Sequence, residues 1–275
     1  MSPATTKLLT MYSLLRACHP GPSGVVALGG FLLALAAGHS LGRAAVVGTA
    51  VLAGQFSIGW SNDWFDAPRD RAAGRTDKPV AGGDVSVRTV ATAAFAAAAV
   101  TAVLSLWLGW VAGTLHLIGV AAGWLYNWPL KASWASVVPY CVGFGLLPGF
   151  VVAARPDHPA PPWWLLLAGA LLGAGAHFAN TLSDQAADVR TGVLGLPQRL
   201  GPVWSRALAV VLLLAAGAVL VLRRGSPAGW VVLAGSALAL VGAVQLRRRY
   251  GERLLFRVVL AVALVDVALL LTSPI

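Results

Sequence analysis

The 275-residue chain is too apolar for an ordinary soluble protein, because 58% of its residues are hydrophobic and only 11% are charged. Soluble domains carry about 25% charged residues. A net charge of +10 would suit nucleic acid, but the basic residues lie in short loops between apolar runs and form no basic helix. The composition therefore predicts an integral membrane protein and argues against a nucleic-acid-binding one.

The first 22 residues precede the apolar runs. In this N-terminal segment, 1–22, Leu8, Tyr12 and Leu15 share one helical face, which predicts a helix lying along the membrane interface. A membrane-spanning helix needs about 20 mostly apolar residues. Nine runs satisfy this length, at 23–41, 43–62, 87–108, 110–128, 135–154, 163–182, 204–222, 228–246 and 255–272. No linker separates them, so we expect one all-α integral membrane domain, 1–275, with about nine transmembrane helices.

The basic residues predict which way these spans run. With nine spans, the N-terminus and every second connection lie on one side of the bilayer. Of the 20 lysines and arginines, all but Arg43, Arg155, Arg223 and Arg224 fall on that side. Positively charged loops stay in the cytoplasm. We therefore expect a multi-pass protein of the cell membrane, with a cytoplasmic N-terminus and the C-terminus on the opposite side.

Acidic residues are rare and concentrated at two places on the cytoplasmic side. The patterns are Asn62-x3-Asp66-x3-Asp70 and Asn180-x3-Asp184-x3-Asp188. Residues four apart share a helix face, so each pattern directs three oxygen-bearing side chains the same way. Such oxygens suit Mg²⁺, which combines one or two carboxylates with substrate phosphates. A single pattern would fit a solvated helix end equally well, but two copies on one side favour a metal site.

Basic residues accompany the two patterns. Arg75 and Lys78 follow the first pattern, and Lys131 follows the fourth predicted span. They suit the phosphate oxygens that a metal leaves uncovered, although cytoplasmic loops are basic for other reasons too. Arg16 and His19 precede the first span and are weaker candidates for binding an anionic acceptor.

Three residues inside predicted spans are weaker candidates. Asp266 is costly in the last apolar run, which suggests a function, but a carboxylate that snorkels or pairs with a neighbouring helix near the outer end is the favoured interpretation. His177 lies one turn before Asn180 and is a candidate for facing a cavity. His116 is better interpreted as a hydrogen-bonded packing residue.

Several motifs carry a family resemblance. NDWFDAPRD at 62–70 and RTDKPVAGG at 75–83 resemble the first signature of the UbiA superfamily of intramembrane prenyltransferases. NTLSDQAADVRTG at 180–192, followed by LPQRLG at 196–201, resembles the second signature, and LYNWPLK at 125–131 resembles the family's tyrosine–lysine element. The resemblance covers nearly the whole chain. Pro68 inside the first motif is a departure, as are Gln185 and Ala187 in the second.

The resemblance implies a helical bundle around a central cavity, capped by the aspartate motifs. It implies that Asn62, Asp66 and Asp70 bind one Mg²⁺, and that Asp184 and Asp188 bind another with help from Asn180. Asp63 matches an additional substrate-binding aspartate of many first motifs. Tyr126 and Lys131 are expected near the diphosphate and act with the four metal-binding aspartates in catalysis.

We therefore expect a Mg²⁺-dependent enzyme that transfers a prenyl group from a prenyl diphosphate to a lipophilic acceptor within the membrane, with an aromatic acceptor favoured. One alternative is a membrane terpene cyclase, which would share the ionisation step and need no acceptor. A more remote alternative is a transporter or channel, which would place polar residues at mid-membrane rather than at one surface.

Overall fold

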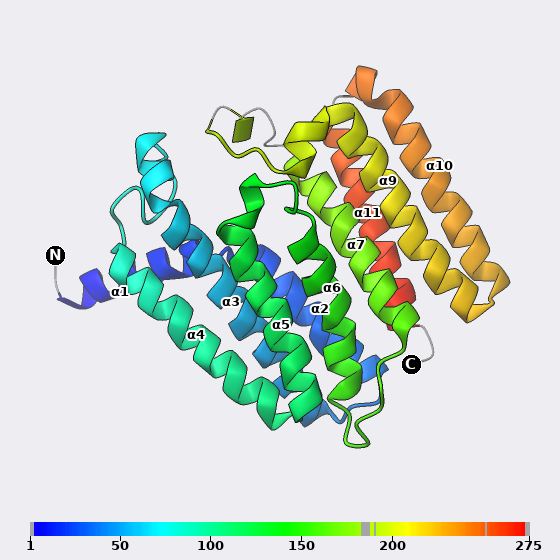
Figure 1. Ribbon diagram of the computed structural model, residues 1–275, viewed down its shortest axis with the longest axis horizontal. Helices are drawn as coiled ribbons and strands as arrows, with labels where there is room; N and C mark the ends of the chain where they lie inside the picture. Colours follow the sequence, from blue (N-terminus) through cyan, green and yellow to red (C-terminus); the bar gives the residue numbers. More distant parts are fainter. Residues whose placement is uncertain (1–2, 183–187, 190, 251, 273–275) are drawn as a thin grey trace.

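The computed structural model describes residues 3–182, 188–189, 191–250 and 252–272, and this part of the chain contains helices and no strands (Figure 1). The elements are α1 (Pro3–Ala17), α2 (Pro20–Ala36), α3 (Leu41–Ala72), α4 (Val87–Trp107), α5 (Trp110–Asn127), the 3₁₀ turn η1 (Leu130–Ala132), α6 (Val138–Ala153), α7 (Trp163–Thr181), α9 (Leu196–Arg224), α10 (Pro227–Tyr250) and α11 (Glu252–Leu271). Among these residues, each predicted span coincides with one helix between α2 and α11, which confirms the all-α class.

Helix α3 is longer than its predicted span. It has 32 residues and continues through the first aspartate motif to Ala72. The apolar run ends at about residue 62, but the backbone hydrogen bonds of a helix do not require apolar side chains. Pro68 lies inside α3 without ending it, because a proline removes only one of these bonds. Helix α9 likewise begins at Leu196 rather than at 204, with a kink at Gly201, where φ is 79°.

Membrane-spanning character is clearest in four of the described helices. Helices α3, α4 and α9 and residues Pro227–Leu246 of α10 are each long and apolar enough to cross a bilayer. Residues Leu9–Ala17 and Pro20–Ala36 meet the same test only together, and they are bent by 64°. Helix α6 is apolar but has only 16 residues. The chain is therefore a multi-span membrane protein.

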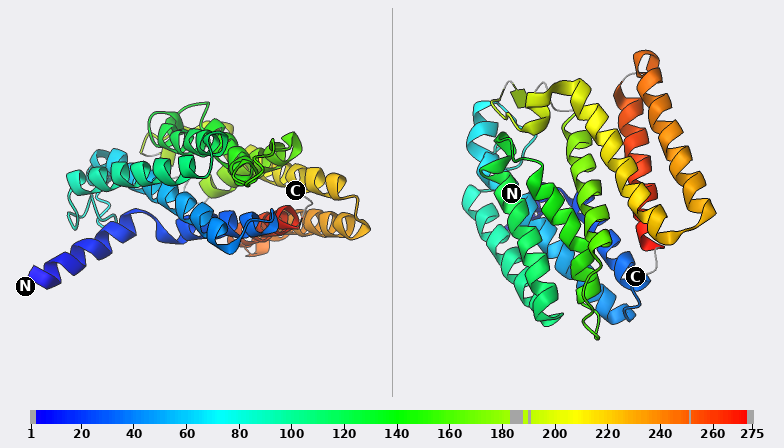
Figure 2. Two further views of the ribbon diagram at one scale, coloured as in Figure 1. Left: turned by 90° about the horizontal axis from the view of Figure 1, so that it is seen from below. Right: turned by 45° about the vertical axis from the view of Figure 1, so that its right-hand side comes forward.

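The order of the helices brings both aspartate motifs to one end of the bundle. Helices that follow one another in the chain pack side by side, and α11 also packs against α2. In Figure 1 the ends of α3, α5, α7 and α10 lie toward the upper edge, and the connections after α2, α4, α6 and α9 lie along the lower edge. The left view of Figure 2 shows α1 projecting from the bundle.

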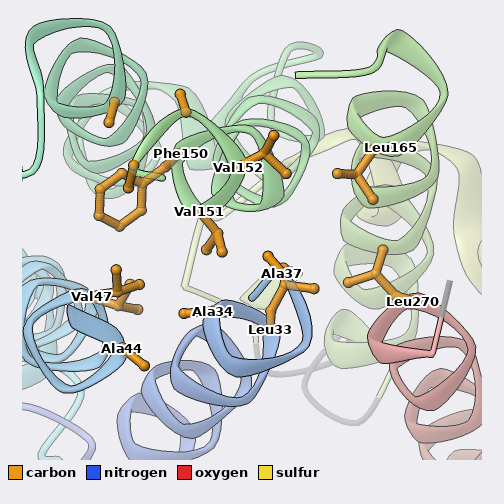
Figure 3. Packing of buried hydrophobic residues seen from close by; sticks show 14 of the residues in the cluster. Leu33, Ala34, Ala37, Ala44, Val47, Phe150, Val151, Val152, Leu165 and Leu270 are labelled. Atoms are coloured by element: carbon orange, nitrogen blue, oxygen red, sulfur yellow. The ribbon is translucent and has the colours of Figure 1, made fainter. Parts of the chain in front are cut away.

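The main hydrophobic core lies at the end away from the motifs. Figure 3 shows Leu33, Val47, Phe150 and Leu165 meeting there from α2, α3, α6 and α7. Arg43 closes this end, because its Nε donates to the carbonyl oxygen of Ala154 at 2.6 Å and its Nη2 donates to that of Leu108 at 2.9 Å. Ala154 and Leu108 are the C-cap residues of α6 and α4, so Arg43 binds the carbonyl ends of both helices. The polar residues of the aspartate motifs lie at the opposite end of the bundle.

Close packing of α6 against α7 depends on two glycines of α7. A Cβ atom at Gly169 would lie 2.4 Å from the carbonyl oxygen of Phe144, and one at Gly173 would lie 2.4 Å from that of Tyr140. Small residues four apart let two membrane helices approach closely. This contact sets the distance between α7 and Tyr140.

We expect Gly173→Ala to lower the free energy of unfolding by about 1–3 kcal/mol, because the added methyl group overpacks a backbone contact. Gly235→Ala on α10 is the matched control, since a Cβ there would meet nothing within 4 Å. Thermal unfolding of both variants in detergent, followed by circular dichroism, measures the difference. Equal stabilities would contradict the packing argument.

Candidate active site

Helix α3 buries the carboxylates of the first motif. Asp63, Asp66 and Asp70 are 2%, 8% and 6% exposed, although they lie in the polar end of the helix. Their spacing places them on one side of α3, facing the bundle. Burying three carboxylates is costly unless cations accompany them. The structure supplies those cations from three different segments.

Asp66 is the best-paired of the three carboxylates. Its Oδ1 accepts a hydrogen bond from the Nζ of Lys131, and its Oδ2 accepts one from the Nη2 of Arg69 at 2.8 Å. Arg69 also lies 3.9 Å from Asp70. Lys131 reaches this position from η1, after α5. Burial lowers the pKa of Lys131, while the Asp66 carboxylate opposes that effect.

Asp63 belongs to a separate cluster. The Nζ of Lys78 donates to its Oδ1 at 3.0 Å, and the Nε2 of His19 lies 3.5 Å from the same atom. His19 adopts a left-handed backbone conformation, with φ at 53°, at the joint between α1 and α2. Backbone conformations of this kind cost energy and cluster at functional sites. Asp63 therefore ties the loop 73–86 and the N-terminal joint to α3.

The remaining predicted basic residues lie at the surface beside this cluster. Arg16 donates from Nη2 to the carbonyl oxygen of Asp77 at 3.0 Å. Arg75 forms two hydrogen bonds of 2.9 Å to the Asp77 carboxylate and thereby lowers the pKa of Asp77 to about 2. The structure therefore brings Arg16 and Lys78 together around the loop 73–86, and it pairs Arg75 with an exposed carboxylate.

Asn62 is held by a residue that the sequence did not single out. Its Nδ2 donates to the Oδ1 of Asn127 at 3.2 Å, and the Nδ2 of Asn127 donates at 2.8 Å to both the Ile58 carbonyl and the Ser61 hydroxyl. Asn127 thus fixes the end of α5 to α3. Its position between Tyr126 and Lys131 in the LYNWPLK motif is the sequence feature that could have identified Asn127.

The second motif is described only in part. Asp184 lies outside the described residues. Asn180 lies in the last turn of α7, and Asp188 accepts a hydrogen bond from the Nε2 of Gln198 at 2.8 Å. Within the described ranges, no three His, Cys, Asp or Glu side chains form a metal site by themselves. The predicted ligand set is larger, since it includes Asp184 and the amides Asn62 and Asn180.

Two tyrosines connect the motifs. Tyr126 lies close enough to both Asp66 and Asp188 to interact electrostatically with each. Its ring meets that of Tyr140 edge-on, with 5.1 Å between the ring centroids, and Tyr140 lies close enough to Asn180 to interact with it. The two motifs, 118 positions apart in the chain, therefore approach the same pair of tyrosines.

A mostly apolar pocket lies directly beside these tyrosines. It encloses about 790 Å³, its open mouth included, between α2, α3, α5 and α6, and both Tyr126 and Tyr140 line it. Its other walls include Val51, Ile58 and Phe144. His116 has the predicted hydrogen bond, to Ser105 at 2.7 Å, but it also lines the pocket, whereas His177, the candidate for facing a cavity, is not among the lining residues. The polar cluster and the apolar pocket thus share Tyr126.

Comparison with known proteins decides the family. Residues 23–265 match the sequence profile of the UbiA prenyltransferase family. The chain belongs to the UbiA prenyltransferase family. A digeranylgeranylglyceryl phosphate synthase from Methanopyrus kandleri is 32% identical over 253 residues, which cover 84% of this chain and 90% of that protein.

Solved structures agree on the fold of this UbiA-family protein. A UbiA homologue from Aeropyrum pernix matches with a TM-score of 0.73 at 20% identity, over 90% of this chain and 96% of that one. A UbiA homologue from Archaeoglobus fulgidus, bound to DMAPP and Mg²⁺, matches with a TM-score of 0.69 at 18% identity. The match covers 96% of this chain and 100% of that one. The predicted family, fold and prenyltransferase class are confirmed.

We expect Asp66→Ala to reduce prenyl transfer by at least about 100-fold, because it removes a buried carboxylate that organises Lys131 and Arg69. Asp157→Ala is the control, since Asp157 is exposed and paired with Arg155 at the opposite end of the bundle. Product formation by the purified variants, with Mg²⁺ present, measures the effect. Substantial activity of Asp66→Ala would remove this residue from the site.

Proposed function

We propose that the protein uses Mg²⁺ to transfer a prenyl group from a prenyl diphosphate to a lipophilic acceptor that carries an anionic head group. The observation that carries this proposal is the position of Tyr126, which lines an apolar pocket and lies close enough to the paired Asp66 carboxylate to interact with it electrostatically. A prenyl diphosphate has the same two parts, a charged head and an apolar chain.

The donor atoms near Asp66 fit Mg²⁺. Asp66, Asp70 and Asp188 offer carboxylate oxygens, and Asn62 and Asn180 offer amide oxygens, which are the ligand types that this ion prefers. Asp184 is proposed as a further ligand from the motif. When bound, Mg²⁺ would neutralise the departing diphosphate. Archaeoglobus fulgidus relatives bound to DMAPP or to GPP with Mg²⁺ support this assignment.

The protein's own residues would assist ionisation in two ways. Lys131 and Arg69 hold positive charge beside Asp66, where it would stabilise the oxygens of the leaving diphosphate. The rings of Tyr126 and Tyr140 lie at the pocket, where their faces would stabilise an allylic cation. The apolar walls exclude water, which would otherwise capture that cation.

The acceptor site is proposed at the cluster around the loop 73–86. Arg16, His19 and Lys78 gather there beside the buried Asp63, and Arg16 bonds only to a backbone carbonyl among the contacts described. Such a cluster suits a phosphate or carboxylate head group. The name of the Methanopyrus kandleri relative denotes a glyceryl phosphate product. An aromatic acceptor remains a prediction from the sequence.

Topology is proposed from charge alone. The edge that carries the two motifs also carries most lysines and arginines, so we place it in the cytoplasm and the C-terminus on the other side. The N-terminal segment 1–22 is proposed to lie along the same membrane surface. The loop 73–86 would then face cytoplasmic water.

We expect purified protein with Mg²⁺ and geranylgeranyl diphosphate alone to release diphosphate slowly. Release should accelerate when a prenylated glyceryl phosphate is added, because the acceptor removes the cation productively. Mass spectrometry of the lipid extract measures the coupled product. Fast release with a cyclic hydrocarbon as product, in the absence of acceptor, would favour the cyclase instead.

The acceptor site generates a second prediction. We expect Arg16→Gln to raise the KM for a phosphate-bearing acceptor about tenfold, which corresponds to the loss of one charge-assisted hydrogen bond. The KM for the prenyl diphosphate should stay unchanged. Arg155→Gln, at the opposite edge, is the control for the loss of an arginine. Equal effects on both substrates would place Arg16 outside the acceptor site.

A further inference from the structure

A buried serine and a buried histidine meet where three segments of the site converge. Ser136, in the connection after η1, is 0% exposed, and His177 on α7 is 1% exposed. The Ser136 Oγ lies 3.1 Å from the His177 Nε2, and it accepts a hydrogen bond from the backbone N–H of Leu196 at 2.8 Å. One hydroxyl group therefore joins η1, α7 and the start of α9.

The hydrogen bonding of this group is incomplete. The Leu196 N–H must donate to Ser136, so the Ser136 hydrogen is available for the His177 Nε2. The Nδ1 of His177 is buried and has no hydrogen-bond partner among the described residues. Either tautomer leaves Nδ1 unmatched, which is costly in a buried place. Apolar side chains would fill this space at a lower cost in free energy, so packing alone does not explain the pair.

The group lies between the two aspartate motifs. Gly195 packs against the backbone of the tyrosine–lysine element, because a Cβ atom there would lie 2.6 Å from the carbonyl oxygen of Lys131 and 2.9 Å from the Ser136 Oγ. Lys131 bonds to Asp66 of the first motif. On the other side, Gln198 of α9 donates to Asp188 of the second motif at 2.8 Å.

His177 adds a connection to the tyrosines. Its ring centroid lies 4.6 Å from that of Tyr140 and 5.7 Å from that of Tyr126, and it precedes Asn180 by one turn of α7. A shift of the histidine ring would therefore move the two rings that line the pocket. The serine–histidine pair therefore contacts the start of α9 and both tyrosines of the pocket.

We propose that Ser136 and His177 are positioning residues. They hold Lys131 and the start of α9 in fixed positions relative to each other, so that both motifs bind the same diphosphate. The inference rests on the proposed function, because it concerns binding of the prenyl diphosphate at that site. Neither residue needs to touch the substrate. Their loss should weaken diphosphate binding more than it weakens the fold.

Ser57 on α3 provides a matched control for Ser136. Its hydroxyl group is also fully buried and also makes two hydrogen bonds, because it donates to the Ala94 carbonyl oxygen at 2.9 Å and accepts from the Trp124 Nε1 at 3.0 Å. These bonds join α3 to α4 and α5, and Ser57 is not among the residues that line the pocket. Ser136→Ala and Ser57→Ala each remove two hydrogen bonds of a buried serine, so a purely structural role predicts the same consequences for both variants.

The experiment measures binding of geranylgeranyl thiodiphosphate, a slowly ionising analogue, by calorimetry at several Mg²⁺ concentrations. We expect Ser136→Ala to raise its Kd at least about tenfold, as supporting residues of a metal site commonly do, and to require more Mg²⁺. Ser57→Ala should bind as the wild type does. The melting temperatures of the two variants should be alike.

Gly195→Ala is the second variant, because its methyl group would push the start of α9 away from Lys131 and Ser136 while both side chains of the pair remain present. It should weaken analogue binding in the same way as Ser136→Ala. If Ser136→Ala does not fold, the affinity of Gly195→Ala alone tests the positioning role. Wild-type affinity in Gly195→Ala, or equal losses in the Ser136 and Ser57 variants, would overturn the positioning role. A wild-type protein that binds no analogue would refute the proposed function instead.

Discussion

The burial of carboxylates at one end of α3 is the constraint on which the rest of the structure depends. Three aspartates are withdrawn from water there, and each such charge must be balanced locally. The balancing cations come from α3 itself, from η1 and from the loop 73–86. This end of the bundle is therefore held by charge, whereas the opposite end is held by the apolar core and by Arg43.

That division suits a substrate with a charged head and a long apolar tail. The pocket is bounded by four helices and is lined by Tyr126 and Tyr140. Glycines at 169 and 173 let α6 approach α7 closely, which sets where Tyr140 stands relative to Asn180. Packing of small residues in the membrane thus positions polar groups at its surface.

Two clusters of different character share the polar end. Asp66, with Lys131 and Arg69, adjoins the pocket, while Asp63 engages Lys78 and His19 near the surface. Asp63 and Asp66, which are one turn apart on α3, therefore pair with cations from different segments. The separation is consistent with one place for the diphosphate and another for the acceptor head group, each with its own cations.

The sequence by itself determined the helical class, the approximate spans and the common location of Asp66, Asp70, Asn180 and Asp188 at one end. These follow from the length of apolar runs and from helical periodicity, which are local properties. Only the tertiary structure decided that Lys131 pairs with Asp66, that Lys78 pairs with Asp63, and that Asn127 and Ser136 hold the site together. Those contacts join residues far apart in the chain, and they depend on how helices pack, which spacing along the sequence does not encode.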